Sequence, residues 1–543
     1  MKRLKKILDS RIAGIICFLF AVANRIIFTS LNSLIGTDTK IQLTYTQNLL
    51  AGKGMGVTKY FTADLAQPFY DTQQIFPPGF SLAIIPFLKL SGGNEYNAVL
   101  IFDILASVLF VIAVRRLASQ NELPRLFVNI ITLVAGCFQF LFFSSWSSTD
   151  AISLCFVLFG LSQAISTIGK KENISLLRMM GCGLLFSLPF FFRYMYLPVA
   201  LLFPFLILIS GIIYKNKNLK IAGSKFFAAT ISWLAVFFAF SLFTSGNALF
   251  VQDFGRGLFF NQLADWYPFL PASFINLDFA AQLTEKVFGI SYSRAMSFSE
   301  IFNVLLFVLL LVLLWQYLKK LKKKLPLSNH SHFIIIGAAV SISIIVLLAY
   351  LTLTYKSLTW GYSKWTHSQH ARYYAFIYIF IPLLFFTCLH HYYSYFKKPV
   401  AVLFVFFGFA CITTEAVHGV YYNIKIINNH KDLALIRDAD KGYRKFSSVI
   451  AGIKNNNPGC EVIVSSPDQY YLHAASQMGY KAIFDYENLE KVNMYVNIKT
   501  ILLMPVHQQE AVIMKNYIEK KKPYLFSEIA GTFFYTEEIS PNK

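Results

Sequence analysis

Charged residues are scarce in this chain. Of its 543 residues, only 14% are Asp, Glu, Lys or Arg, whereas 56% are hydrophobic. A soluble globular protein carries about 25% charged residues, so the composition excludes that class, and the high apolar content excludes disorder. Cysteine is also rare, with seven residues in the chain, which excludes a small disulfide-stabilised scaffold. The remaining class is a helical protein that crosses a membrane several times.

Acidic residues are few relative to basic ones, at 28 against 49, which gives a net charge of +21. A net charge of this size can indicate nucleic-acid binding. The distribution of the charge along this chain does not support such binding. Residues 422–543 hold 15 Lys and Arg against 13 Asp and Glu, so nearly all of the excess precedes them. There it lies in short clusters between apolar runs, which is typical of membrane topology signals. Nucleic acid is therefore not an expected partner.

Long apolar runs are abundant. A spanning helix needs about 20 mainly apolar residues. We predict eleven spans, some of them short: 12–34, 97–114, 126–143, 149–168, 178–192, 195–213, 222–244, 302–318, 332–354, 374–394 and 399–416. With a cytoplasmic N-terminus, every predicted cytoplasmic loop is basic and the opposite loops hold most of the acids, as the positive-inside rule requires. The chain would then end on the extracytoplasmic side.

One apolar segment, residues 78–90, is not counted because it is short and has Pro86 in its middle. We expect it to lie along the outer membrane interface.

Three predicted outer regions are long, namely 35–96, 245–300 and the tail from 417. The tail alternates strand-like and helix-like patterns, with strands expected at 460–466, 480–486 and 499–506 and helices at 468–479 and 508–522. The predicted fold is therefore an all-α polytopic membrane domain of about 11 transmembrane helices, residues 1–416, followed by a small extracytoplasmic α/β domain, residues 417–543.

Asp38 is the most informative acid of the first outer loop. It follows the first predicted span within a few residues, and Ile41, Tyr45 and Leu49 then recur at helical spacing until Gly52. A carboxylate at the membrane surface can act as a general base. Asp is also a favoured residue at the start of a helix, so Asp38 can equally cap this one, and both roles can coexist.

The first outer loop resembles that of multi-pass glycosyltransferases of the GT-C type, a group that includes the protein O-mannosyltransferases and the aminoarabinose transferases of lipid A. The resemblance rests on Asp38, Tyr45 and QNLLAGKG at 47–54. Further similar segments follow in the same order: FPPGFSLAIIPFLKLSG, the pair Arg115 and Arg116, SSTDAISL, FFFRYMYLP and HARYYAFIYIFIPLL. Two positions depart from the family pattern, Thr39 in place of a second acid and Phe76 in place of a lysine.

The resemblance implies an inverting transfer of a monosaccharide from a polyprenyl-phosphate sugar to an acceptor hydroxyl. The acceptor would be a glycan, a lipid or a protein, at the extracytoplasmic face of the cell (inner) membrane. Asp38 would take the proton of the hydroxyl, and Tyr45 would lie in the substrate site. The leaving phosphate needs fixed positive charge. For this we favour Arg372, with His370 beside it, then Arg193, and we include Arg256 of the second long outer loop.

Other interpretations of these residues remain open. Asp150 can orient the acceptor, hold a cation or simply cap the span that it precedes, and the arginines can extend to lipid headgroups. No cofactor is expected. A divalent cation at Asp38 and Asp150 is an alternative, although hard cations want several oxygen ligands.

Two other functions compete with the transferase. A lipid-linked glycan transporter or flippase would place charges deep in several spans or use paired broken helices. A non-catalytic relative of the GT-C type would bind the lipid without transferring sugar, and Thr39 keeps that alternative open.

Overall fold

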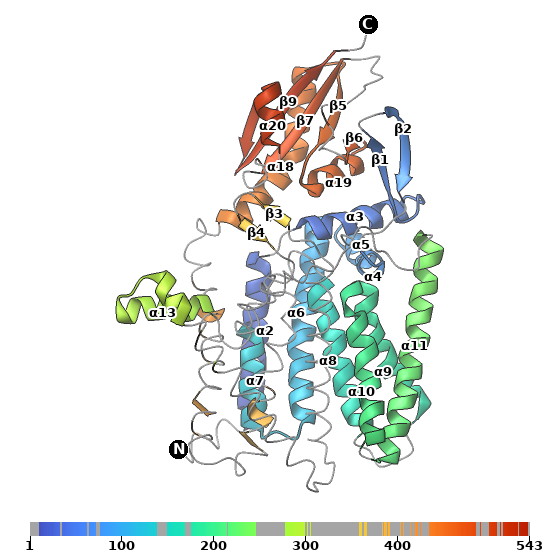
Figure 1. Ribbon diagram of the computed structural model, residues 1–543, viewed down its shortest axis with the longest axis vertical. Coiled ribbons are helices and arrows are strands. Elements are labelled where there is room, and N and C mark those ends of the chain that lie inside the picture. Colours follow the sequence, from blue (N-terminus) through green and yellow to red (C-terminus); the bar gives the residue numbers. More distant parts are fainter. Residues whose placement is uncertain are drawn as a thin grey trace.

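The computed structural model describes residues 10–32, 35–61, 64–71, 76–137, 149–168, 175–213, 215–245, 277–298, 434–484, 499–507, 514–529 and 531–540, with short pieces between 301 and 424 and at 489 and 511. In Figure 1 upright helices form a bundle, and a sheet with its helices sits beyond one end of it.

The described helices of the bundle coincide with the first seven predicted spans. They are α2 (Arg11–Asn32), α6 (Glu95–Gln120), α7 (Arg125–Cys137), α8 (Thr149–Ile168), α9 (Leu176–Phe192), α10 (Leu197–Ile213) and α11 (Lys217–Ser245). Within the described part of the chain, α2, α6, α8 and α11 are long and apolar enough to cross a membrane, whereas α7, α9 and α10 are shorter apolar helices. The other predicted spans, 302–318, 332–354, 374–394 and 399–416, lie outside the described residues except for scattered positions. The total of eleven therefore stays a prediction.

Small residues allow the helices of the bundle to approach closely, as is common where lipid replaces water. A Cβ on Gly136 of α7 would lie 2.5 Å from the Cα of Ala21 in α2. A Cβ on Gly223 of α11 would lie 2.5 Å from the backbone nitrogen of Leu208 in α10. Larger side chains at these glycines would therefore separate the paired helices.

The first outer loop is built from short elements. They are α3 (Thr37–Leu50), β1 (Val57–Phe61), β2 (Asp64–Asp71), α4 (Gly79–Ala83) and α5 (Ile85–Leu90). The helix expected over 78–90 is thus two short helices that meet at Ile84, and Pro86 is the second residue of α5. In Figure 1 α3 lies across the end of the bundle, between it and the sheet, with α4 and α5 beneath.

The C-terminal residues form an α/β unit. Its elements are α18 (Ala434–Asn456), β5 (Glu461–Ser465), α19 (Gln469–Gln477), β6 (Lys481–Ile483), β7 (Thr500–His507), α20 (Lys515–Lys521), β8 (Tyr524–Ile529) and β9 (Thr532–Ile539). The three predicted strands and the first predicted helix lie at β5, β6, β7 and α19, and α20 covers the end of the second predicted helix. Helix α18 and the β8–β9 hairpin were not predicted.

The sheet of this unit includes two strands from the first outer loop. Its seven strands follow the order β2-β1-β6-β5-β7-β9-β8. Strand β1 runs parallel to β6, with Tyr60 opposite Ile483, and β5 runs parallel to both β6 and β7. The two edge pairs, β1–β2 and β8–β9, are antiparallel. The sheet therefore crosses the predicted boundary at 416, and whether residues 417–543 fold as a separate domain stays a prediction.

Candidate functional site

Helix α3 carries Asp38 and is buried although its sequence is not apolar. All residues from Thr39 to Thr46 are buried, whereas Asp38 is partly exposed. The helix satisfies its own polar groups locally, because the hydroxyls of Thr44 and Thr46 donate to the backbone carbonyls four residues earlier, at 3.0 Å and 2.9 Å. The apolar residues Ile41 and Tyr45 pack in a cluster with Met55 and Val57 of the same outer loop. Helix α3 therefore lies buried between the bundle and the α/β unit.

Asp38 does not occupy the N-cap of α3. That position belongs to Gly36, and Asp38 is the second residue of the helix. A carboxylate in the first turn is favoured by the positive end of the helix dipole. Its backbone carbonyl accepts a hydrogen bond from Nε2 of Gln42 at 3.0 Å. The catalytic role of Asp38 stays a prediction.

The start of α3 is bound to the α/β unit through Asp468. Oδ1 of Asp468 accepts from the hydroxyl of Thr37 at 3.0 Å and from the backbone nitrogen of Tyr470 at 2.9 Å, so Asp468 also caps α19. Oδ2 accepts from the hydroxyl of Tyr443 at 2.6 Å. Burial raises the pKa of this carboxyl above its ordinary value, and these hydrogen bonds oppose the shift. Asp468 therefore fixes the residue that directly precedes Asp38.

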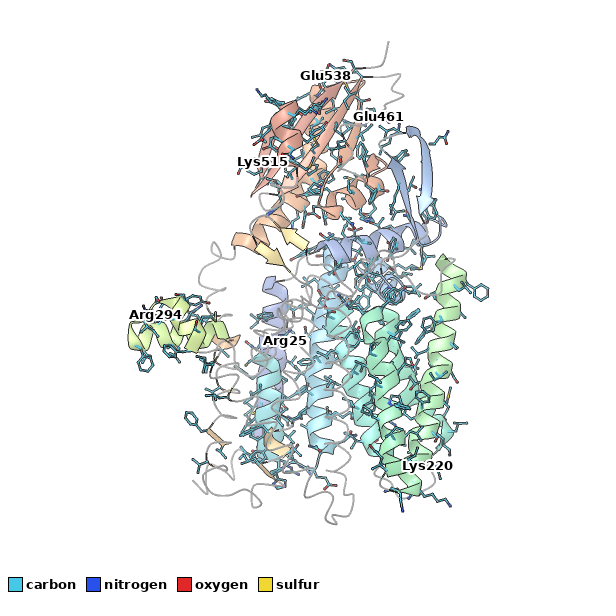
Figure 2. The ribbon with its side chains drawn as sticks, viewed as in Figure 1. Arg25, Lys220, Arg294, Glu461, Lys515 and Glu538 are labelled. Atoms are coloured by element: carbon cyan, nitrogen blue, oxygen red, sulfur yellow. The ribbon has the colours of Figure 1, made fainter. Side chains whose placement is uncertain are left out.

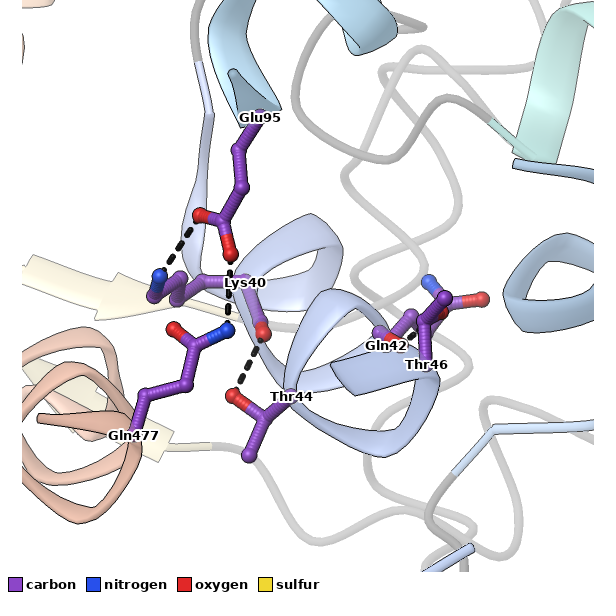
Figure 3. Close-up of polar contacts among 6 residues, drawn as sticks. All are labelled: Lys40, Gln42, Thr44, Thr46, Glu95 and Gln477. Atoms are coloured by element: carbon purple, nitrogen blue, oxygen red, sulfur yellow. Dashed lines mark hydrogen bonds and ion pairs between the residues drawn. The ribbon is translucent and has the colours of Figure 1, made fainter. Parts of the chain in front are cut away.

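A second connection lies one turn further along α3. Nζ of Lys40 is 2.7 Å from Oε2 of Glu95 at the start of α6, and Oε1 of Glu95 accepts from Nε2 of Gln477 in α19, also at 2.7 Å. Figure 3 shows this chain of contacts, in which Glu95 lies between the lysine and the amide. Nζ of Lys40 also lies 5.8 Å from the ring centroid of Tyr470. One carboxylate thus links α3, the bundle and the α/β unit.

Aromatic contacts hold the middle of α3 against the same unit. Tyr45 is buried, and its ring meets His473 of α19 edge-on, with the centroids 6.5 Å apart. His473 also meets the ring of Phe484 at 5.3 Å. Burial, followed by the charges of Lys59 and Lys40, lowers the pKa of His473 to about 3. Tyr45 therefore packs in an interface, and its predicted role in substrate binding stays a prediction.

Helix α4 connects α3 to the end of α9. The hydroxyl of Thr46 donates to the carbonyl of Ser81, and the hydroxyl of Ser81 donates to the carbonyl of Gln42, both at 3.0 Å. On the other side of α4, a Cβ on Gly79 would lie 2.4 Å from the backbone oxygen of Phe191. Only glycine allows this approach. The helix of Asp38 is thereby packed, through α4, against the residues that immediately precede Arg193.

The structure brings Arg193 and Asp150 together. Nε of Arg193 lies 3.0 Å from Oδ1 of Asp150, and both side chains are at least nine-tenths buried. Nη1 of Arg193 also donates to the hydroxyl of Thr149 at 3.3 Å. Asp150 lies in the first turn of α8, and Arg193 follows the last residue of α9. A guanidinium held in this way is oriented before any ligand arrives, and its charge is partly balanced by Asp150.

Several buried polar atoms have no hydrogen-bond partner within the described part of the chain. Two of them follow the predicted acids by one turn, Oε1 of Gln42 after Asp38 and Oγ of Ser153 after Asp150. Orphaned buried polar atoms are costly and often belong to functional sites. The sequence analysis missed both residues, although their helical spacing from the two acids is a signal that could have found them. Lys40 and Asp468 were missed because their partners are distant in the sequence.

Three of the predicted site residues, Arg372, His370 and Arg256, lie outside the described residues, and their roles stay predictions. The chain that precedes His370 forms a hairpin of β3 (Leu358–Trp360) and β4 (Ser363–Trp365). Figure 1 places this hairpin at the level of α3, below α18. Within the described ranges, no three His, Cys, Asp or Glu side chains gather as a metal site. Dependence on a divalent cation stays untested.

Comparisons with known proteins concern the fold alone. No protein-family model matches the chain, and no curated protein matches it in sequence. Among solved structures, the chain is similar to ArnT from Cupriavidus metallidurans bound to undecaprenyl phosphate, with a TM-score of 0.52, 11% identity, and coverage of 97% of this chain and 98% of ArnT. It is also similar to the apo oligosaccharyltransferase of Archaeoglobus fulgidus, with a TM-score of 0.52, 12% identity, and coverage of 90% of this chain and 69% of that one. The resemblance to GT-C glycosyltransferases therefore holds at the level of the fold.

Proposed function

We propose that this protein is an integral membrane glycosyltransferase that uses a polyprenyl-phosphate monosaccharide as donor. The observation that carries the proposal is the position of Asp38, in the first turn of a helix laid across the end of a bundle that shares its fold with ArnT. The related ArnT structure contains undecaprenyl phosphate. A donor with a long apolar chain can stay in the bilayer while its sugar reaches this end of the bundle.

The proposed reaction is a single displacement. The acceptor oxygen attacks the anomeric carbon, the bond from that carbon to the phosphate oxygen breaks, and the polyprenyl phosphate leaves with the electron pair. Asp38 takes the proton of the acceptor hydroxyl, because a carboxylate within hydrogen-bond reach is a suitable general base. The configuration at the anomeric carbon inverts, and no sugar is bound covalently to the protein.

The leaving phosphate needs positive charge that is already in place. Arg193 can supply it, since Asp150 and Thr149 orient its guanidinium at the end of the bundle where α4 joins α3 to α9. In the absence of substrate, the charge of Asp150 offsets that of Arg193. When the donor binds, its phosphate and Asp150 would both contact the guanidinium of Arg193. Arg372, with His370 beside it, is the first choice for the second cation of the proposed site, and Arg256 would also contact the donor or acceptor. No cofactor takes part in the proposed reaction.

The proposal extends to the sidedness of the chain. The end that holds α3 and the α/β unit would be extracytoplasmic, and the basic end, with Arg115 and Lys220, would be cytoplasmic. This assignment follows the positive-inside rule. In Figure 2 Lys220 lies at the end of the bundle opposite Glu461 and Glu538.

The deciding experiment follows labelled sugar from a mixture of polyprenyl-phosphate donors in membranes that contain the protein. Asp38→Asn should lower the rate about a hundredfold to ten-thousandfold, because a lost general base costs that much. Glu528→Gln is the matched control, since it changes an exposed carboxylate of β8 to an amide. Equal transfer by the Asp38→Asn variant and the unmodified protein would exclude Asp38 as the base. Absence of transfer with every donor and acceptor class would exclude the transferase.

A further inference from the structure

A cavity of about 490 Å³ opens at the end of the bundle opposite α3. It lies where the start of α2, the end of α6 and the start of α7 meet. Three arginines, one from each helix, line it: Arg11, Arg115 and Arg125. Ser119 and Asn129 add polar groups to the wall. None of these residues belongs to the site around Asp38.

Within the described ranges, the lining of this cavity holds three arginines and no acid. Among the residues that the structure describes, no carboxylate forms an ion pair with Arg11, Arg115 or Arg125, and no acid lines the cavity. Glu122 lies in the turn between α6 and α7 but outside the lining. Three guanidinium groups around one space repel one another, so an anion between them would be strongly favoured.

One of the three guanidinium groups is held in place. Nη1 of Arg115 donates to Oδ1 of Asn129 and to the hydroxyl of Thr132, both at 3.3 Å. Gly14 of α2 lies against its other terminal nitrogen, because a Cβ at that position would be 2.9 Å from Nη2 of Arg115. The glycine therefore leaves room for the guanidinium beside the helix. Arg115 is therefore oriented by hydrogen bonds inside a cavity, whereas an arginine that acts only as a topology signal needs no fixed position.

The surroundings of the cavity are apolar on the side toward the bilayer. Ile15 lines the cavity and is 59% exposed, and Ile12 beside it on α2 is 70% exposed. An adjoining cavity of about 460 Å³ shares Arg115 and Ser119 with the first. Phe18 and Ile112 form its apolar wall, and Arg116 and Gln120 complete its lining. A ligand with a phosphate and a long apolar tail would fit both cavities at once.

We propose that this pair of cavities binds an anionic phospholipid, with its phosphate among Arg11, Arg115 and Arg125 and an acyl chain along Phe18 and Ile112. The site is separate from the proposed transfer reaction and does not depend on it. Each arginine near an anionic lipid contributes about a fivefold gain in affinity. Lipids with a net negative charge are therefore retained over zwitterionic ones.

Native mass spectrometry of the full-length protein in detergent tests this proposal, with phosphatidylglycerol and phosphatidylcholine as the added lipids. The unmodified chain should retain phosphatidylglycerol preferentially. Arg125→Gln should weaken its retention about fivefold, and the double variant Arg115→Gln/Arg125→Gln about twenty-five-fold. Arg178→Gln is the matched control, because Arg178 is an exposed arginine in the first turns of α9 that lines neither cavity. It should retain lipid like the unmodified chain.

Two further experiments complete the test. One asks whether the bound anion is a lipid or a soluble phosphate, and the other detects variants that are misfolded. Inorganic phosphate at millimolar concentration should not displace the lipid, and displacement would assign the site to a soluble anion instead. Gly14→Ala should also lower retention, because its Cβ would displace Nη2 of Arg115. The thermal unfolding of each variant is measured alongside. Equal retention of the two lipids, or equal retention by the Arg125→Gln and Arg178→Gln variants, would overturn the proposal. Arg125 is exposed, so its variant can be judged even if Arg115→Gln fails to fold.

Discussion

His473 is a buried titratable residue in the interface that holds α3, and it makes the stability of that interface dependent on pH. Its pKa is lowered to about 3 from 6.5, first by burial and then by Lys59 and Lys40. Between these two values the unfolded chain binds a proton that the folded protein does not. The contribution is therefore fully present above pH 6.5 and is lost as the pH falls toward 3.

We expect stability to fall by up to about 1.4 kcal/mol per pH unit below pH 6.5 on account of His473 alone. His473→Leu should remove this part of the slope, because leucine fills a similar volume between the rings and does not titrate. Thermal unfolding of both proteins at pH 7, 6, 5 and 4 checks the prediction. Parallel pH profiles for the two would show that His473 is not responsible.

Gly79 allows helix α4 to lie against the end of α9, because a side chain at this position would clash with the backbone of Phe191. Gly79→Ala should lower the free energy of unfolding by about 1–3 kcal/mol, the usual cost of overpacking. Because α4 is bonded to α3, the substitution should also lower sugar transfer. Thermal unfolding and the labelled-sugar assay are the measurements.

Gly181→Ala is the control for this prediction. Gly181 lies inside α9, and a Cβ there would meet no atom within 4 Å. Alanine is favoured over glycine in a helix interior by up to about 1 kcal/mol. The control should therefore be neutral or slightly stabilising, and equal effects of the two variants would show that the contact of Gly79 with Phe191 does not matter.

The positions of most bundle helices could be predicted from the sequence, because each spanning helix corresponds to a single apolar run. Helices α2 and α8 begin and end within two residues of the predicted spans. The α/β sheet could be predicted only in part. Strand β1 is a five-residue segment without a distinct pattern, and its partner β6 lies more than 400 residues away. The ion pair of Asp150 and Arg193 was not predicted, because the sequence does not show that the start of α8 and the end of α9 lie side by side.

At the scale of the whole molecule, Glu95 couples the bundle to the α/β unit through Lys40 and Gln477. Glu95→Gln should lower the free energy of unfolding by about 2 kcal/mol, because it leaves the buried Lys40 without its carboxylate. The double variant Lys40→Met/Glu95→Gln should lose less than the sum of the single variants, since the unpaired charge is then gone. A double-mutant cycle by thermal unfolding measures this coupling.

A second measurement shows where the coupling acts. Protease should release the α/β unit faster from the Glu95→Gln variant than from the unmodified protein. Lys515→Met is the control, because its contact with Glu519 is an exposed pair within α20. Strictly additive effects of the Lys40 and Glu95 substitutions would show that the contact contributes nothing.

The hydrogen bond between Thr37 and Asp468 joins residues 431 positions apart. A ribosome that adds about 5–20 residues per second needs roughly 20 to 90 seconds to travel that distance. During this interval the early spans can already enter the bilayer, while α3 lacks its contact with Asp468 and β1 lacks its partner strand β6. On the proposed function, a nascent chain would meet lipid-linked sugars with its future base still unfixed. Transfer would begin only after residues 468–483 have emerged, so the order of synthesis itself delays the onset of activity.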